Sequence, residues 1–307
     1  MEQHVTERTR RLYSDCVACM LRNQAKNYPP DAPEDRKVAW SVALCRLMGE
    51  ATATTCTLEI MHRLYAVQDE LFPGWRRDYT GEKDRFNRIM LTQEDWVRER
   101  IRGSADPLRT AIQYAMMGNY IDFTSVSNVN EAELKRMLSS AEETEVDDAV
   151  LRRLKDRLRK AKSVVLLADN CGEIVMDKLL LEVVRGMTEG SLTAIVKGAD
   201  VENDATMADA RQTGLDRVAR VMGHGTDYAG FHPNHIDDAA FAALTGADVV
   251  IAKGMANLET LFGFGYPIFY IFLCKCDLFA RRFSARLMQG MLADEETIGN
   301  MDWVLRV

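Results

Sequence analysis

The spacing of apolar residues changes near residue 160, and this change constrains the fold more than any other feature of the sequence. Before it, apolar residues recur every three or four positions, as in 38–48 and 111–116, which is the spacing of amphipathic helices. After it, short continuous apolar runs begin with 163–168, a pattern typical of strands buried on both faces of a sheet. The sequence therefore predicts a helical N-terminal part followed by an α/β part.

Four further strand candidates follow this first run, and segments with helical spacing separate them. Strands that alternate with helices predict a Rossmann-like parallel sheet with right-handed crossovers and helices on both faces. We expect an all-helical domain over 1–160 and an α/β domain over 161–307. The predicted strands are 163–168, 192–196, 217–222, 248–252 and 267–273, and the predicted helices between them include 172–185, 204–212 and 236–244.

Length and charge exclude several classes of protein. A chain of 307 residues, with 47% hydrophobic and 28% charged residues, can bury a sizeable core. Its net charge of −7 disfavours nucleic acid as a partner, because phosphates favour basic surfaces. The longest apolar stretch, 266–274, is too short for a membrane helix, which needs ~20 residues. No apolar leader follows the first charged residues, so we expect a cytoplasmic protein without a membrane partner.

Polar clusters follow four consecutive predicted strands, where ligands bind in parallel sheets. Asp169 and Asn170 follow the first strand, Asp204 the second, 224–227 the third and Lys253 the fourth. Two carboxylates and an amide oxygen suit Mg²⁺ or Mn²⁺ better than zinc, and a lysine there brings a positive charge to a phosphoryl oxygen. Each acidic residue taken alone is also a good helix cap, and Asp204 most of all.

The same clusters resemble motifs of the damage-control phosphatases. The resemblance extends from Gly118 to Cys276, and the cysteine motifs are similar to those of the mainly prokaryotic branch of that family. The motifs that carry it are Gly118-Asn-Tyr-Ile-Asp122, Asp169-Asn-Cys-Gly-Glu-Ile-Val-Met-Asp177, Asn203-Asp-Ala-Thr206 with Asp209, Lys253-Gly-Met-Ala-Asn257-Leu-Glu259-Thr260, Cys16-Val-Ala-Cys19 and Lys275-Cys276.

This resemblance implies a metal-dependent phosphatase that hydrolyses small phosphorylated metabolites, either sugar phosphates or damaged phosphometabolites. The domain 161–307 would be the metal-binding catalytic domain, and 1–160 would cover its active-site cleft. The implied cofactor is Mn²⁺, Co²⁺, Ni²⁺ or Mg²⁺, held by Asp169, Asn170 and Asp204. Asp169, Asp204 and Lys253 would be catalytic, with Lys253 on the phosphate, and the substrate pocket would include Asn119, Asp122, Glu173, Asn257 and Glu259.

The nucleophile stays open between a metal-bound water and the Asp169 carboxylate. Haloacid-dehalogenase-type phosphatases place a second Asp two residues after the first, whereas this chain has Cys171 there, which disfavours that family. A dinucleotide-binding enzyme is also disfavoured, because no G-x-G-x-x-G pattern follows the first predicted strand.

The cysteines support an alternative function. Seven cysteines in a chain without a secretion signal indicate reduced thiols, metal ligation or redox chemistry. Cys16 and Cys19 are one helical turn apart, and together with Cys274 and Cys276 they could form a four-thiolate metal or redox site. The alternative function is therefore a thiol-ligated metal or redox-sensing protein without phosphatase activity. The other interpretation of the two cysteine pairs is that they are buried small residues with no role in metal binding or redox chemistry.

Overall fold

The computed structural model describes residues 11–118 and 131–300. The chain divides into two compact units, one comprising Met1–Asp78 with Tyr228–Gly230 and the other Tyr79–Asp227 with Phe231–Val307. The helices between residues 80 and 158, which the sequence-based boundary placed in a separate helical domain, therefore belong to the same unit as the sheet. No helix in the described ranges is long and apolar enough to cross a membrane.

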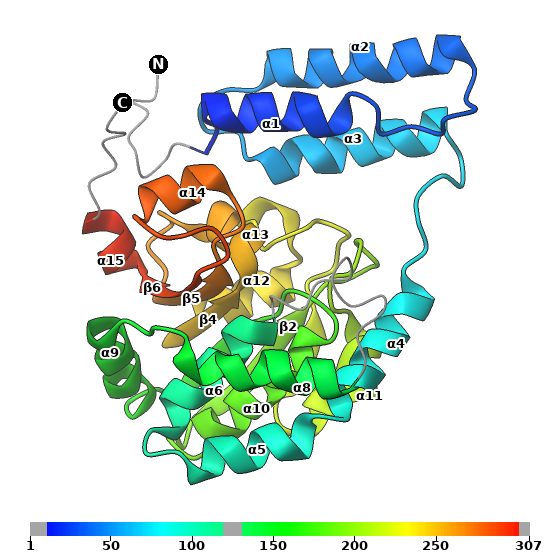
Figure 1. Ribbon diagram of the computed structural model, residues 1–307. Helices are drawn as coiled ribbons and strands as arrows, with labels where there is room; N and C mark the ends of the chain where they lie inside the picture. The colour runs from blue at the N-terminus through cyan, green and yellow to red at the C-terminus, as the bar shows by residue number, and fades with distance from the viewer. Residues whose placement is uncertain (1–10, 119–130, 301–307) are drawn as a thin grey trace. The chain divides into compact units, whose positions relative to one another are not determined.

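The first unit is built from three helices, drawn in blue and cyan in Figure 1. Their buried residues form one apolar cluster that includes Trp40, Leu44, Ile60 and Leu64. The indole N–H of Trp40 donates to the carbonyl of Gln24 at 2.7 Å, so this large side chain is satisfied although it is buried. The helices are α1 (Ser14–Gln24), α2 (Glu34–Glu50) and α3 (Thr57–Leu71).

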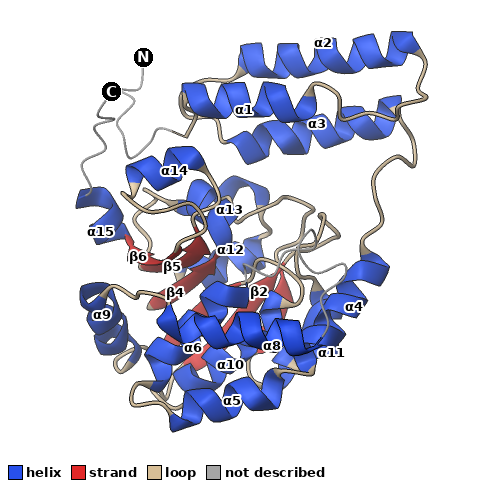
Figure 2. Cartoon of the chain, in the orientation of Figure 1, coloured by secondary structure: helices blue, strands red, loops and turns tan. Residues whose placement is uncertain are grey.

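The second unit is a six-stranded sheet with helices on both faces (Figure 2). The strand order is β3-β2-β1-β4-β5-β6, and only the last pair, β5 and β6, is antiparallel. The Rossmann-like fold class is thus confirmed, and the order places a topological switch point between β1 and β4. The strands are β1 (Ser163–Leu167), β2 (Ser191–Val196), β3 (Arg220–Gly223), β4 (Val249–Lys253), β5 (Ile268–Leu273) and β6 (Gly290–Asp294).

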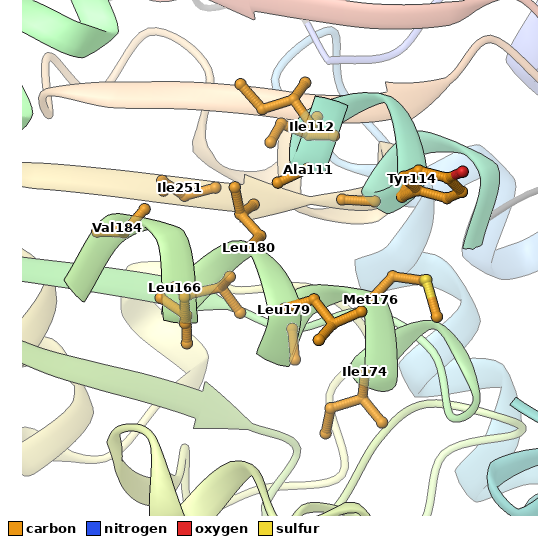
Figure 3. Close-up of a cluster of buried hydrophobic side chains, with 14 of the residues drawn as sticks. Ala111, Ile112, Tyr114, Leu166, Ile174, Met176, Leu179, Leu180, Val184 and Ile251 are labelled. Carbon is orange, nitrogen blue, oxygen red and sulfur yellow. The ribbon is translucent and has the colours of Figure 1, made fainter. Parts of the chain in front are cut away.

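Alternate residues of each central strand enter different cores, because successive side chains of a strand point to opposite faces. In β1, Leu166 packs into a cluster with α6 and α10, whereas Val165 and Leu167 pack into a cluster with α12 and α13. Figure 3 shows the first cluster, where Leu166 and Ile251 of the sheet lie near side chains of α10 and α6. The helices of this unit are α4 (Thr80–Leu91), α5 (Glu94–Gly103), α6 (Pro107–Gly118), α8 (Glu131–Ser139), α9 (Asp148–Leu158), α10 (Glu173–Arg185), α11 (Met207–Thr213), α12 (Asp238–Thr245), α13 (Gly254–Leu261), α14 (Asp277–Arg282) and α15 (Glu295–Asn300).

Two strands differ from the sequence prediction by more than one residue at either end. The third strand begins at Arg220 rather than at residue 217, because Gly214 takes a left-handed conformation with φ of +73° and a short 3-10 helix, Leu215–Arg217, follows it. The sixth strand was not predicted at all. It lies antiparallel to β5 at the edge of the sheet, and although it is mostly buried it has only three consecutive apolar residues, Met291–Ala293, too few to stand out in the sequence.

Candidate functional site at the carboxyl ends of β1, β2 and β4

The loops after β1 and β2 are hydrogen-bonded to each other beyond the ends of the strands. The carbonyl of Asp169 accepts from the amide of Ala205 at 2.8 Å, and the amide of Cys171 donates to the carbonyl of Asn203 at 2.9 Å. These bonds hold two loops that are more than thirty residues apart in the sequence as one paired segment. The acidic residues of both loops are therefore fixed on one rigid stretch of main chain.

The pairing brings together the three residues predicted to hold a metal ion. Asn170 and Asp204 face each other in an isolated antiparallel bridge, and Asn170 Nδ2 donates to Asp169 Oδ2 at 2.7 Å. Asp204 is not the cap of α11, since Thr206 and Asp209 form the capping box of that helix. The capping interpretation of Asp204 is therefore wrong, and its carboxylate lies next to the loop that follows β1.

Both carboxylates are buried in an environment that penalises negative charge. Burial raises the pKa of Asp169, and the nearby charge of Glu173 raises it further. Burial likewise raises the pKa of Asp204 to about 7, against the ammonium of Lys197, which lowers it. Among the described residues Asp204 Oδ2 has no hydrogen-bond partner, and Lys197 Nζ lies 3.5 Å from it. One ammonium beside the two buried carboxylates of Asp169 and Asp204 leaves a negative charge that a further cation would neutralise.

The donor set fits a hard divalent cation. Asp169 and Asp204 supply carboxylate oxygens, Asn170 supplies an amide, and such oxygens are the ligands that Mg²⁺ and Mn²⁺ prefer. Over residues 11–118 and 131–300, no group of three or more His, Cys, Asp or Glu side chains is arranged to hold a metal ion. The candidate set instead combines two acidic side chains with one amide.

The loop after β4 approaches Asp169 so closely that only glycine fits. Gly254 has a φ of +78°, and a Cβ atom built on it would lie 2.1 Å from Asp169 Oδ2. A side chain at this position would therefore push the carboxylate out of place or shift the loop. The glycine after the fourth predicted strand thus permits close approach of the main chain to the acidic site.

Lys253 was predicted to contact the phosphate of the substrate, and in the structure its ammonium binds three groups of the protein. Its side chain is fully buried, and Nζ donates to Glu173 Oε1, to Asp177 Oδ1 at 2.7 Å and to the carbonyl of Ala115 at 3.1 Å. An ammonium has three N–H groups, and these three acceptors use all of them. A direct contact to a phosphoryl group would require one of these bonds to break.

The charges around Lys253 are mutually dependent. Burial works to lower the pKa of Lys253, but the carboxylates of Asp177 and Glu173 outweigh it and raise that pKa. Burial raises the pKa of Asp177 to about 7 although Lys253 opposes the shift. Glu173 also accepts from Asn170 Nδ2 at 3.1 Å, so this buried cluster supports the loop that carries the candidate metal ligands.

The remaining predicted pocket residues divide into two groups. Asn257 is buried, and its Nδ2 donates to the carbonyl of Lys253 at 2.6 Å, so it stabilises the turn from β4 into α13. Glu259 lies on the same helix and is partly exposed. Asn119 and Asp122 lie outside the described residues, and their part in the pocket stays a prediction.

The two cysteine pairs belong to different units. Cys16 and Cys19 lie on α1, and Cys19 is exposed. In the other unit, Cys274 is buried, with Sγ 4.0 Å from the carbonyl oxygen of Cys276, and burial raises the pKa of its thiol to about 11. The four-thiolate site stays a prediction.

Two residues important to this site were not predicted. Lys197 directly follows β2 and Lys253 is the last residue of β4, each with a glycine after it, and this recurrence was a signal in the sequence. Asn87 of α4 gives no such signal. Its Oδ1 accepts from the amide of Gly172 at 2.6 Å, and its Nδ2 donates to Asp209 Oδ1 at 2.8 Å, so it links the loop after β1 to α11.

The fold and the site together define an α/β protein with a buried acidic site beyond the switch point of its sheet. Residues 12–289 match the family model of the damage-control phosphatase ARMT1-like domain, and the chain belongs to this family.

The chain is similar to proteins of Archaeoglobus fulgidus, Methanocaldococcus jannaschii and Pyrococcus horikoshii. The chain is 33% identical to a damage-control phosphatase of Archaeoglobus fulgidus over 215 aligned residues. This alignment covers 68% of this chain and 72% of the relative. It is 28% identical over 276 residues to an uncharacterized protein of Methanocaldococcus jannaschii, with 85% and 88% covered. A crystal structure of a DUF89 family protein from Pyrococcus horikoshii shares the fold with a TM-score of 0.74. The two sequences are 22% identical, and the match covers 92% of this chain and 99% of that one. Family membership supports a phosphatase role.

Proposed function

We infer that the chain is a divalent-metal-dependent phosphatase that hydrolyses small phosphorylated metabolites, such as sugar phosphates or damaged phosphometabolites, in the cytoplasm. The observation that carries the proposal is the pair of buried carboxylates Asp169 and Asp204. Asp204 Oδ2 has no hydrogen-bond partner among the described residues, and one ammonium, that of Lys197, lies 3.5 Å from it. Asp204 lies opposite Asn170, at the strand ends where ligands of parallel sheets bind. Membership of the damage-control phosphatase family supplies the reaction class.

Asp169, Asn170 and Asp204 would hold the metal ion, which is Mn²⁺, Co²⁺, Ni²⁺ or Mg²⁺. When bound, the ion supplies positive charge that stabilises the phosphoryl oxygens during transfer. The chain fixes its ligands before substrate binds, because the paired loops and Asn170 Nδ2 hold the Asp169 carboxylate in one orientation. Preorganised groups of this kind contribute to catalysis because they need not reorganise during the reaction.

The substrate pocket would lie beyond this site. We place Glu259 at its edge, because that side chain is partly exposed on the helix that starts beside Asp169. Asn119 and Asp122 would contribute from the segment after α6. Gly118, the last described residue before them, lies so close to Glu173 that a Cβ atom on it would be 3.2 Å from Glu173 Cγ.

The test compares Asp204→Asn with Asp200→Asn, a control in the same loop whose side chain is 74% exposed. Both variants remove one charge with little change in shape. The protein is stripped with a chelator and supplied with each of the four metals, then assayed with p-nitrophenyl phosphate and a panel of sugar phosphates. Asp204→Asn should lose more than about 100-fold in turnover, because losing only an outer partner of a metal ligand costs roughly 10–100-fold. Asp200→Asn should retain turnover.

Metal binding provides the second measurement. Equilibrium dialysis should show that Mn²⁺ binds to the wild-type chain and to Asp200→Asn, and that Asp204→Asn binds it more weakly. Turnover and Mn²⁺ binding unchanged in Asp204→Asn would refute the assignment. A wild-type chain that is inactive with every metal, and that carries a thiolate-bound metal as purified, would instead favour the thiol-metal alternative.

A further inference from the structure

Lys197 is buried without the hydrogen bonds that a buried ammonium requires. Its side chain is fully buried, and its Nζ makes no hydrogen bond among the described residues. A buried charged group normally finds donors or acceptors for all its polar atoms, because desolvation is otherwise uncompensated. Lys253, by contrast, uses all three of its N–H groups. Of these two buried lysines at strand ends, Lys197 is the one with N–H groups still available.

The position of Lys197 directs this available charge at the acidic site. Its Nζ lies 3.5 Å from Asp204 Oδ2 and 4.9 Å from the centre of the Phe231 ring. Its main chain is fixed, since the Lys197 amide donates to the carbonyl of Ala205 at 2.9 Å.

Counting charges distinguishes the two buried lysines. Lys253 forms ion pairs with Glu173 and Asp177, and this group of three carries a formal charge of −1, so it offers no attraction to an anion. The two carboxylates of the candidate metal site would be neutralised by one divalent ion. Lys197 then places a positive charge beside the neutralised metal ligands, and a local positive charge favours binding of a phosphate dianion.

We propose that Lys197 binds the phosphoryl group of the substrate, with its N–H groups donating to the non-bridging phosphoryl oxygens. This inference rests on the proposed phosphatase function and assigns the phosphate contact to the lysine after β2. Lysine suits this role as a point charge with three donors. Phe231 would hold the ammonium over its ring while the site is without substrate.

The test compares Lys197→Met with the matched variant Lys253→Met and with Lys197→Arg. The first measurement is the affinity of the Mn²⁺-loaded protein for inorganic phosphate, by calorimetry and as an inhibition constant. Lys197→Met should weaken phosphate binding by about 10-fold or more, the loss expected for hydrogen bonds to a charged group. Lys197→Arg should restore part of it, because the charge and the donors return.

The second measurement is the affinity for Mn²⁺ without phosphate, together with the unfolding midpoint. Lys197→Met should retain Mn²⁺ binding, because it removes a positive charge beside the metal ligands. It also removes the ion pair with Asp204, so the unfolding midpoint should fall, but less than in Lys253→Met, which loses two ion pairs and three hydrogen bonds. Wild-type phosphate affinity in Lys197→Met would overturn the proposal, and so would a loss of Mn²⁺ affinity as large as the loss of phosphate affinity.

These outcomes separate this inference from the proposed function. If the wild-type chain hydrolyses p-nitrophenyl phosphate and Lys197→Met binds phosphate equally well, the phosphatase function is supported and the phosphate contact of Lys197 is refuted. An inactive wild-type chain whose phosphate binding still depends on Lys197 refutes the phosphatase and supports the binding role. A wild-type chain that binds no phosphate refutes this inference directly.

Discussion

Replacing Lys253 by methionine should destabilise the α/β unit strongly, because it leaves two carboxylates buried without their cation. The side chains of Lys253, Glu173 and Asp177 are all fully buried, so solvent cannot replace the lost ammonium. Breaking a buried ion pair by removing one partner costs about 3–5 kcal/mol. We expect a loss of this size at pH 8, since methionine retains the volume of the side chain and removes only its charge and donors.

The loss should shrink as the pH falls. Burial already raises the pKa of Asp177 to about 7 in the presence of Lys253, and removing that cation raises it further. A folded-state pKa above that of the unfolded chain means that the folded state holds its proton more tightly, so stability falls as the pH rises towards that pKa. The deficit of Lys253→Met should therefore be larger at pH 8 than at pH 5.5.

The assay is urea unfolding followed by circular dichroism at both pH values, with the triple variant Lys253→Met/Glu173→Gln/Asp177→Asn as the control. The triple variant removes all three charges, and replacing a whole buried ionic cluster is often neutral. It should therefore recover most of the loss. A deficit below about 1 kcal/mol at pH 8, or one that is equal at both pH values, would refute the reasoning.

A glycine and an ion pair give two further expectations. Gly254→Ala and Gly265→Ala carry a similar cost of positive φ, about 1–2 kcal/mol, but only at Gly254 does the new Cβ overlap Asp169. Gly254→Ala alone should lower Mn²⁺ affinity roughly 10-fold or more, and equal affinities in dialysis would contradict the contact. Burial works to raise the pKa of Asp294, but Arg153 outweighs burial and holds that pKa below its usual value. The ion pair between Asp294 and Arg153 therefore stabilises the fold at neutral pH, and this stabilisation is lost as the pH falls below ~4. The thermal midpoint of the wild-type chain should fall more steeply there than that of Asp294→Asn, and parallel curves would exclude this contribution.

The strands that could be predicted are those that are buried on both faces, because such strands have a mostly apolar sequence. The strands β1, β2, β4 and β5 are apolar over most of their length, because helices cover both faces of the sheet. The edge strand β6 has only three consecutive apolar residues. It pairs with β5, which its own sequence does not indicate, and its last residue, Asp294, forms an ion pair with Arg153. The start of β3 depended on one left-handed glycine, Gly214, whose conformation the apolar pattern does not encode.

The acidic half of the candidate site followed from a rule of topology. Asp169, Asn170 and Asp204 come together because the carboxyl ends of neighbouring parallel strands share one edge of the sheet, and β1 and β2 are neighbours. Asn87 could not be found in this way, because it reaches the loop after β1 from a helix eighty-five residues earlier in the chain. Such contacts depend on how α4 packs against the rest of the α/β unit, and the local sequence around Asn87 does not predict this packing.

The two lysines show where sequence reasoning stops. Lys197 directly follows β2, Lys253 is the last residue of β4, and both precede a glycine, so their local sequences predict the same role. The difference comes from α10, where Glu173 and Asp177 are four residues apart on one helical face and both reach Lys253. Lys197 meets Phe231 and a single carboxylate instead. A lysine enclosed by carboxylates holds the fold together, whereas a lysine with N–H groups still available can bind an anion, and only the packing of other elements decides which is which.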